Sequence, residues 1–99
     1  MKIIWSPLAI QRVQEIADYI AYDKPPAAIQ WVESVFDAAE KLQQHPQFGR
    51  QLPELQNPNY REIIHGNYRI IYRLEEKRIL ILTVRHGSQI LPREDLGQE

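Results

Sequence analysis

Apolar residues in the first half of the chain recur at steps of three and four positions, the spacing of one face of an α-helix. One stripe consists of Ile10, Val13, Ile16, Ala17 and Ile20. A second stripe consists of Ala28, Ile29, Val32, Val35, Phe36, Ala39 and Leu42. The pattern therefore predicts two amphipathic helices, and the short link through Pro25-Pro26 predicts that they form an antiparallel hairpin.

Residues that start and stop helices set the limits of this hairpin. Ser6-Pro7 is typical of a helix start, because serine can cap free amides and proline is tolerated at the first helical position. The first helix is expected to end before Lys24, and the second near His45. Ahead of Ser6, residues 2–5 (KIIW) predict a short strand.

From Tyr60 onward the pattern changes to runs that are typical of β-strands. The predicted strands are residues 60–65 (YREIIH), 68–74 (YRIIYRL) and 79–86 (ILILTVRH). Gly66-Asn67 is a two-residue turn signal between the first two strands. The middle strand alternates, with Tyr68, Ile70, Tyr72 and Leu74 on one face and Arg69, Ile71 and Arg73 on the other. Residues 47–59 show no period, and we expect them to form a surface loop.

The predicted order is β-α-α-β-β-β in a single domain spanning residues 1–99. The last three strands form an antiparallel meander, and the first strand joins the same sheet because its backbone groups need partners. The helical hairpin covers one face, which makes this an α+β fold of two layers. The other face, or part of it, is left for function. The charged tail, about residues 89–99, is expected to be flexible or bound to a partner.

Composition narrows the classes of protein that this chain can belong to. It is 43% hydrophobic and 25% charged, as in ordinary globular domains. The absence of cysteine excludes disulfides, thiolate zinc sites and cysteine nucleophiles. No apolar run approaches the roughly 20 residues that span a bilayer, so we expect no membrane association. The N-terminus does not resemble a signal peptide, and the expected compartment is the cytoplasm.

Basic residues are concentrated in the predicted meander. Residues 50–86 carry 7 basic and 4 acidic side chains, whereas the whole chain has a formal charge of −1. Six of these seven cations are arginines, which suit bidentate contacts with carboxylates and phosphates. The candidate residues for binding a target or partner are Arg61, Arg69, Arg73, Arg85 and His86. The alternative is that the arginines only solubilise the surface and that the histidine bonds a nearby carbonyl group.

Motifs for cofactors and metals are missing from the sequence. His45, His65 and His86 lack the spacing of metal ligands, so no metal site is predicted. The four glycines are scattered and form no phosphate-binding loop, and no cofactor is expected. General acid–base cleavage of a phosphodiester stays open, with Arg69 holding the phosphate and His86 titrating near neutrality.

Three stretches of the sequence are more specific than the order of elements, namely residues 2–21, 25–55 and 60–87. Together they resemble the RelE/ParE superfamily of type II toxin–antitoxin toxins. The resemblance covers roughly residues 2–88. Its most specific pieces are the loop His45–Pro53, the strand YRIIY and the ending Val84–Gly87 (VRHG). It implies the same fold, a meander packed on a helical hairpin.

Two activities occur in this superfamily, and the residues favour one of them. RelE-like members cut messenger RNA and carry lysines on the strand before the YR strand, where this chain has Tyr60 and Glu62. A carboxylate there would repel the scissile phosphate. Arg69 does fill the arginine position of the YR strand. The proline-broken loop and the VRHG ending look more like ParE, although Ser88, Gln89 and Ile90 stand where many members continue with arginines.

The ParE-like resemblance implies a toxin that inhibits DNA gyrase, arrests growth and stabilises plasmids. It also implies neutralisation by a cognate antitoxin, whose acidic, partly disordered segment folds on the toxin. One alternative is a RelE-like, ribosome-dependent mRNA endoribonuclease using Arg69 and His86. Another is a folded but inactive toxin that still binds antitoxin. Arg69→Ala or Arg73→Glu is expected to weaken complex formation, or toxicity, without unfolding the domain.

Overall fold

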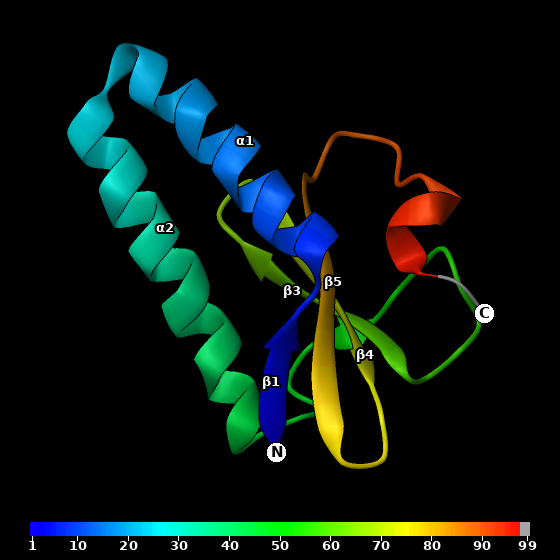
Figure 1. Cartoon of the computed structure of the whole chain (residues 1–99). Coiled ribbons are helices and arrows are strands. Elements are labelled where there is room, and N and C mark those ends of the chain that lie inside the picture. Colours follow the sequence, from blue (N-terminus) through cyan, green and yellow to red (C-terminus); the bar gives the residue numbers. More distant parts are fainter. Residues whose placement is uncertain (98–99) are drawn as a thin grey trace.

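A computed structural model describes residues 1–97 and has the expected α+β architecture. Its elements are β1 (Lys2–Trp5), α1 (Pro7–Asp23), α2 (Pro25–Glu40), β2 (Arg50–Gln51), β3 (Tyr60–His65), β4 (Tyr68–Leu74) and β5 (Arg78–His86). Short 3-10 helices, η1 and η2, span Lys41–Gln43 and Arg93–Leu96. Figure 1 shows α1 and α2 side by side as a hairpin on one side of the sheet, with η2 (red) on the other.

The five strands form one mixed sheet in the order β1-β5-β4-β3-β2. The meander β3-β4-β5 is antiparallel throughout, as predicted. β1 joins the sheet by pairing parallel to β5, with Trp5 opposite Ile81. β2 lies inside the segment 47–59 that the sequence indicated as an unbroken loop. A strand of two residues is too short to show a period, which is why the pattern missed it.

The start of α1 shows why the sequence folds locally as it does. The Ser6 hydroxyl oxygen accepts a hydrogen bond from the Ala9 amide at 3.0 Å, and the same hydroxyl donates to the Leu82 carbonyl at 3.0 Å. Helix α1 ends at Asp23, just before Pro25 begins α2. Within the described residues, no helix is long and apolar enough to cross a membrane.

Apolar side chains form two clusters, one on each face of the sheet. The larger cluster lies between the hairpin and the sheet and includes Ala9, Val13, Val35, Ala39, Leu42, Ile70, Tyr72, Ile79, Ile81 and Val84. The smaller cluster lies on the opposite face and consists of Leu52, Tyr60, Ile71, Leu82, Leu91 and Leu96. The second face is therefore partly covered by the chain itself, so at most part of it is left for function.

Part of the tail, residues 91–96, packs against the sheet. Leu91 and Leu96 are buried in the smaller cluster, and η2 brings Asp95 against β5. Two leucines and one acidic residue are too sparse to produce a periodic signal, so the sequence suggested only a charged end. Residues 98 and 99, the last of the predicted tail, lie outside the described residues.

A bulge in β5 decides which side chains face this tail. Ile71 lies opposite Thr83 and Tyr72 lies opposite Ile81, so Leu82 is the extra residue. Leu82 packs in the smaller cluster and Thr83 bonds to Asp95, so both consecutive side chains meet the tail. The bulge thus turns two consecutive side chains of β5 toward the tail side of the sheet.

Candidate functional site

Arg69 on β4 is buried in a network of ion pairs within the chain. Its side-chain Nε donates to Glu62 at 2.5 Å, and its two terminal nitrogens donate to the two oxygens of Glu54 at 2.9 and 2.7 Å. Glu62, which is only 1% exposed, also accepts from Arg50 at 2.6 Å. The hydrogen bond from Arg69, together with its charge, holds the pKa of Glu54 below its ordinary value despite partial burial. Arg69 is thus engaged on both edges of its guanidinium group.

Arg73, two residues further along β4, also contacts groups of this chain. Two of its nitrogens donate to one oxygen of Glu75, at 3.0 and 2.7 Å, and a third contacts the Tyr60 hydroxyl at 3.3 Å. Its guanidinium carbon lies 5.8 Å from the centre of the Tyr60 ring. Arg78 shares the same carboxylate of Glu75 from the other side.

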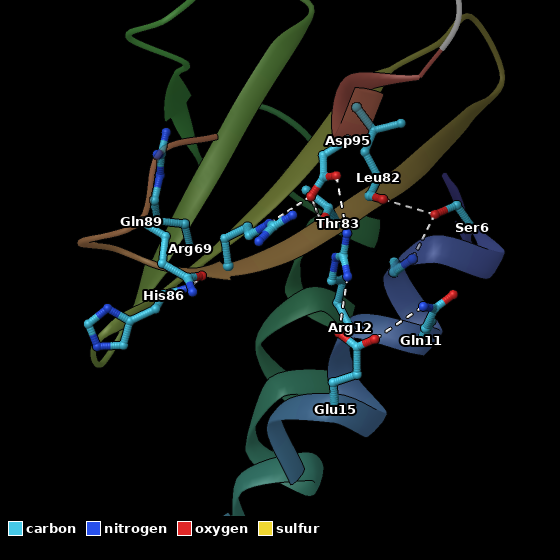
Figure 2. A network of polar contacts seen from close by, with 12 residues as sticks. Ser6, Gln11, Arg12, Glu15, Arg69, Leu82, Thr83, His86, Gln89 and Asp95 are labelled. Atoms are coloured by element: carbon cyan, nitrogen blue, oxygen red, sulfur yellow. Dashed lines mark hydrogen bonds and ion pairs between the residues drawn. The ribbon is translucent and has the colours of Figure 1, made fainter. Parts of the chain in front are cut away.

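Arg85 on β5 pairs with the tail. Its Nε donates to Asp95 at 2.7 Å, and the Thr83 hydroxyl donates to the same Asp95 oxygen at 2.9 Å. Arg12 of α1 reaches the other oxygen at 3.5 Å (Figure 2). Burial favours the neutral acid, but the bonds from Arg85 and Thr83 outweigh it, so the pKa of Asp95 lies below its ordinary value.

Arg61 donates hydrogen bonds to backbone carbonyl groups of the loop 47–59. Its Nε donates to the Pro58 carbonyl at 3.1 Å and a terminal nitrogen donates to the Gly49 carbonyl at 2.8 Å. Gly49 in turn donates its amide to the Tyr72 hydroxyl at 2.9 Å. The Tyr72 hydroxyl donates to the Pro46 carbonyl, and burial raises the pKa of this phenol.

The predicted arginine face is therefore largely neutralised from within. Arg69, Arg73 and Arg85 each bind a carboxylate of the same chain, and Arg61 binds backbone carbonyls. This corrects the expectation that the sheet presents unpaired positive charge to a partner. The pair of Arg73 with Glu75 joins near neighbours in the sequence. The acids that reach Arg69 and Arg85 from the loop and the tail could not be predicted from the spacing of charges, because those pairs form only when the two segments fold back onto the sheet.

His86 does not converge with Arg69, as a phosphodiester-cleaving pair would need to. Arg69 lies opposite Arg85 in the ladder, while the next pair along, Tyr68 with His86, projects to the other face. There the rings of Tyr68 and His86 meet edge to face at 5.3 Å, and Tyr68 also packs on Trp31. The sequence alternative that joined Arg69 and His86 in one site is not supported by this arrangement.

The His86 ring also stabilises the turn after β5. Its Nδ1 accepts a hydrogen bond from the Ser88 amide at 3.1 Å and lies 2.7 Å from the Ser88 hydroxyl oxygen. In the neutral ring this leaves the proton on Nε2. Sequence reasoning foresaw a histidine bonded near the end of a strand, but with a carbonyl group as its partner rather than the Ser88 amide.

A cleft of about 420 Å³ lies between α1 and the end of β5, and His86 is part of its wall. The cleft is lined by Arg12, Glu15, Ile16, Tyr19, Tyr68, Val84, Arg85, His86, Ser88 and Gln89. Tyr19 is 77% exposed at its rim, and Tyr22, one turn further along the helix, is 95% exposed. Tyrosine and arginine side chains are enriched in protein-binding surfaces, and this cleft has both. Of the five predicted residues, the cleft brings together Arg85 and His86.

Sequence reasoning missed Arg12, Glu15 and Tyr19 as site residues. The available signal was that Tyr19 and Tyr22 stand off the apolar stripe of their helix, where a large aromatic side chain faces solvent. Which strand that helix surface would adjoin could not be read from its own spacing. Within residues 1–97, no group of three or more potential metal-ligating side chains comes together.

Comparisons with known proteins agree along almost the whole chain. The family described as the ParE toxin of type II toxin–antitoxin system, parDE, matches residues 3–91. A toxin candidate of Sinorhizobium fredii, Y4kP, is 33% identical over 93 residues, which cover 92% of this chain and 93% of that protein.

Two solved structures share the fold. The chromosomal ParDE toxin–antitoxin system from P. aeruginosa matches with a TM-score of 0.75 and 22% identity, over 87% of this chain and 95% of that one. The RelBE2 toxin–antitoxin complex from Mycobacterium tuberculosis matches with a TM-score of 0.56 and 20% identity, over 86% and 95%. The structural similarity thus extends to both named branches, with the higher score on the ParDE side.

Proposed function

This chain belongs to the ParE toxin family of type II toxin–antitoxin systems, and we propose from that membership that it inhibits DNA gyrase. It is held inactive by a cognate antitoxin that presents an acidic, partly disordered segment. A gyrase inhibitor acts in the cytoplasm, the compartment expected from the sequence. Its action is to bind, and none of its own side chains needs to carry out a chemical step.

The contacts of Arg69 are the observation that favours gyrase inhibition over RNA cleavage. A nuclease needs this guanidinium group to hold a phosphate. Here Glu54 and Glu62 already occupy it, and Glu62 stands where RelE-like nucleases carry a lysine. Two histidines lie at this end of the sheet, His65 and His86. Both lie level with Tyr68 and project from the opposite face, where His65 contacts Ser34 of α2 and His86 contacts the Tyr68 ring. These contacts support an inhibitor that binds its target over a ribonuclease.

The cleft at α1 and β5 is the surface that we assign to the target. It combines the exposed ring of Tyr19 with Tyr68, His86 and Arg85. Arg61, Arg69 and Arg73 are not among the residues that line this cleft, and each binds groups of the same chain.

Two assays on the purified protein test the proposed function. In the first, gyrase acts on plasmid DNA with increasing toxin, and we expect blocked supercoiling or trapped DNA cleavage. In the second, translating ribosomes receive the same protein, and we expect no new cuts in the message. Site-specific cutting of the message would contradict the proposal and favour the ribonuclease. Inactivity in both assays would contradict it too and favour a toxin that only binds antitoxin.

A matched pair of variants tests the cleft. Tyr19→Ser removes the exposed ring at its rim, and we expect about a tenfold rise in the concentration that half-inhibits gyrase, as for a binding hot spot. Phe48→Ser removes another exposed aromatic ring, which lines a separate groove with Met1 and Pro46, and is expected to leave inhibition unchanged. Equal effects of the two variants would refute the assignment of the cleft.

A further inference from the structure

Asp95 is the most completely enclosed carboxylate of the tail, and its partners come from two rigid elements. It is 1% exposed. Arg85 and Thr83 of β5 donate to one of its oxygens. Arg12 of α1 approaches the other oxygen, as the labelled side chains of Arg12, Thr83 and Asp95 show (Figure 2). The three donors are positioned by α1 and β5, whereas the carboxylate arrives on a short 3-10 helix. The donors therefore form an anion site that the tail fills.

The tail is attached mainly through side chains. The amides of Asp95 and Gly97 donate to the carbonyls of Pro92 and Glu94, inside the tail itself. Leu91 and Leu96 enter the smaller apolar cluster on either side of this carboxylate. The connection back to β5 is exposed, and Ile90 in it is 90% exposed.

The two arginines of this anion site are also reachable from outside. Arg12 and Arg85 both line the cleft at α1 and β5, next to His86. Arg12 also contacts an exposed carboxylate of its own helix, since its other terminal nitrogen donates to Glu15 at 3.0 Å. A ligand that displaced the tail would meet two guanidinium groups beside an apolar surface.

We propose that Arg12, Thr83 and Arg85, together with the apolar surface around Leu82, form a docking site for an acidic–apolar peptide. The chain's own segment Leu91–Leu96 is its resident occupant. A protein partner enters by offering the same chemistry, a carboxylate flanked by apolar side chains. Nucleic acid is a poorer match, because a phosphate backbone would leave the apolar surface vacated by Leu91 and Leu96 exposed to water.

Competition with a peptide in trans tests this site in the full-length protein. The probe is a fluorescent peptide with the sequence of residues 88–97 (SQILPREDLG), and its binding is followed by anisotropy. Asp95→Asn weakens the resident tail, so we expect this variant to bind the peptide at least tenfold more tightly than the wild type does. Added salt should weaken that binding, because it depends on ion pairs. The assay needs neither gyrase nor antitoxin, so it stands or falls independently of the proposed function.

Matched controls separate the site from unspecific loosening. Glu94→Gln makes the same charge change at an exposed position of η2 and should leave peptide binding at the wild-type level. A peptide with Asn in place of its Asp should bind Asp95→Asn at least tenfold less tightly than the original peptide. Equal binding of the two peptides, or no binding to Asp95→Asn, would overturn the proposal. Inorganic phosphate that binds Asp95→Asn while the peptide does not would overturn the peptide assignment.

Proteolysis provides a second readout that does not depend on the probe. Trypsin cleavage after Arg93 in the exposed part of η2 is expected to be at least tenfold faster in Asp95→Asn than in wild type or Glu94→Gln. Circular dichroism of all three proteins checks that the rest of the fold is intact. Equal cleavage rates in folded proteins would show that the carboxylate does not hold the tail, and the proposal would fail.

Discussion

On the tail side of the sheet, two ion pairs depend on the single residue Glu62. Its two oxygens bind Arg50 and Arg69, and its side chain is fully buried. Removing charge from such a residue leaves a buried arginine without full compensation, which costs more than loss of the contact alone. Arg69→Ala, expected from the sequence to spare the fold, would instead leave Glu62 short of a partner.

Glu62→Gln is predicted to lower the free energy of unfolding by roughly 3 kcal/mol, because Arg69 stays buried beside a neutral amide. Urea denaturation followed by circular dichroism measures the change. Glu76→Gln is the control, since Glu76 is exposed in the turn between β4 and β5. Its effect is expected to stay within about 0.5 kcal/mol. A loss for Glu62→Gln no larger than for this control would contradict the structural role of the network.

At Gly49, close packing rather than charge sets the constraint. A Cβ atom there would lie 2.6 Å from the Glu62 carbonyl oxygen and 2.7 Å from the Tyr72 hydroxyl. Gly49→Ala is therefore predicted to destabilise the fold by about 1–3 kcal/mol, the usual cost of overpacking. Thermal unfolding of the purified variant measures this, and an unchanged melting temperature would show that the loop moves aside freely.

At the scale of elements, Ser6 lies between β1 and α1, and its side chain links the N-terminal cap of α1 to the bulge in β5. The Ser6 hydroxyl caps α1 and also bonds the Leu82 carbonyl, which belongs to the extra residue of the bulge. One side chain thus ties the start of the helix to the part of β5 that faces the tail. The cap itself was readable from Ser6-Pro7, whereas its second bond joins residues 76 positions apart and depends on the packed fold.

Ser6→Ala is predicted to destabilise the protein by about 1–2 kcal/mol, because it removes the helix cap. Denaturant unfolding gives the magnitude. Hydrogen exchange should also show faster exchange of the Ala9 amide, which loses its acceptor. Ser88→Ala, in the exposed turn after β5, is the matched control. Protection of the Ala9 amide equal to that in the wild type would contradict the cap.

At the scale of the whole molecule, the loop 47–59 and the tail cover part of the sheet face that lies away from the helices. A chain of 99 residues thereby shields apolar side chains on both faces of its sheet from water. The loop supplies Leu52 with Glu54, and the tail supplies Leu96 with Asp95. Each segment thus combines an apolar anchor with an acid that pairs a sheet arginine. Acid should weaken both attachments together, because both carboxylates have a pKa below the ordinary value.

Stability is predicted to fall as the pH drops below about 5. Asp95 and Glu54 have ordinary pKa values of 3.8 and 4.5, and both are lowered in the folded protein. Their contribution is full above those ordinary values and is lost as the pH falls through the lower folded values. Urea unfolding at a series of pH values measures the slope. Asp95→Asn should show a shallower dependence between about pH 5 and pH 2, and an identical slope would contradict the assignment.

The amino-acid sequence alone determined the two helices and the meander, because periodicity, caps and turns are local signals that survive without the fold. It indicated the family through the resemblance of particular stretches to known toxins. Only the tertiary structure decided what the arginines do. Arg12 and Asp95 are 83 positions apart, and no spacing rule brings them together. The tail folds back beside the bulge at Leu82 and brings the Asp95 carboxylate against β5. Long-range packing thus turned a predicted basic surface into a neutralised one and moved the candidate site to the cleft beside it.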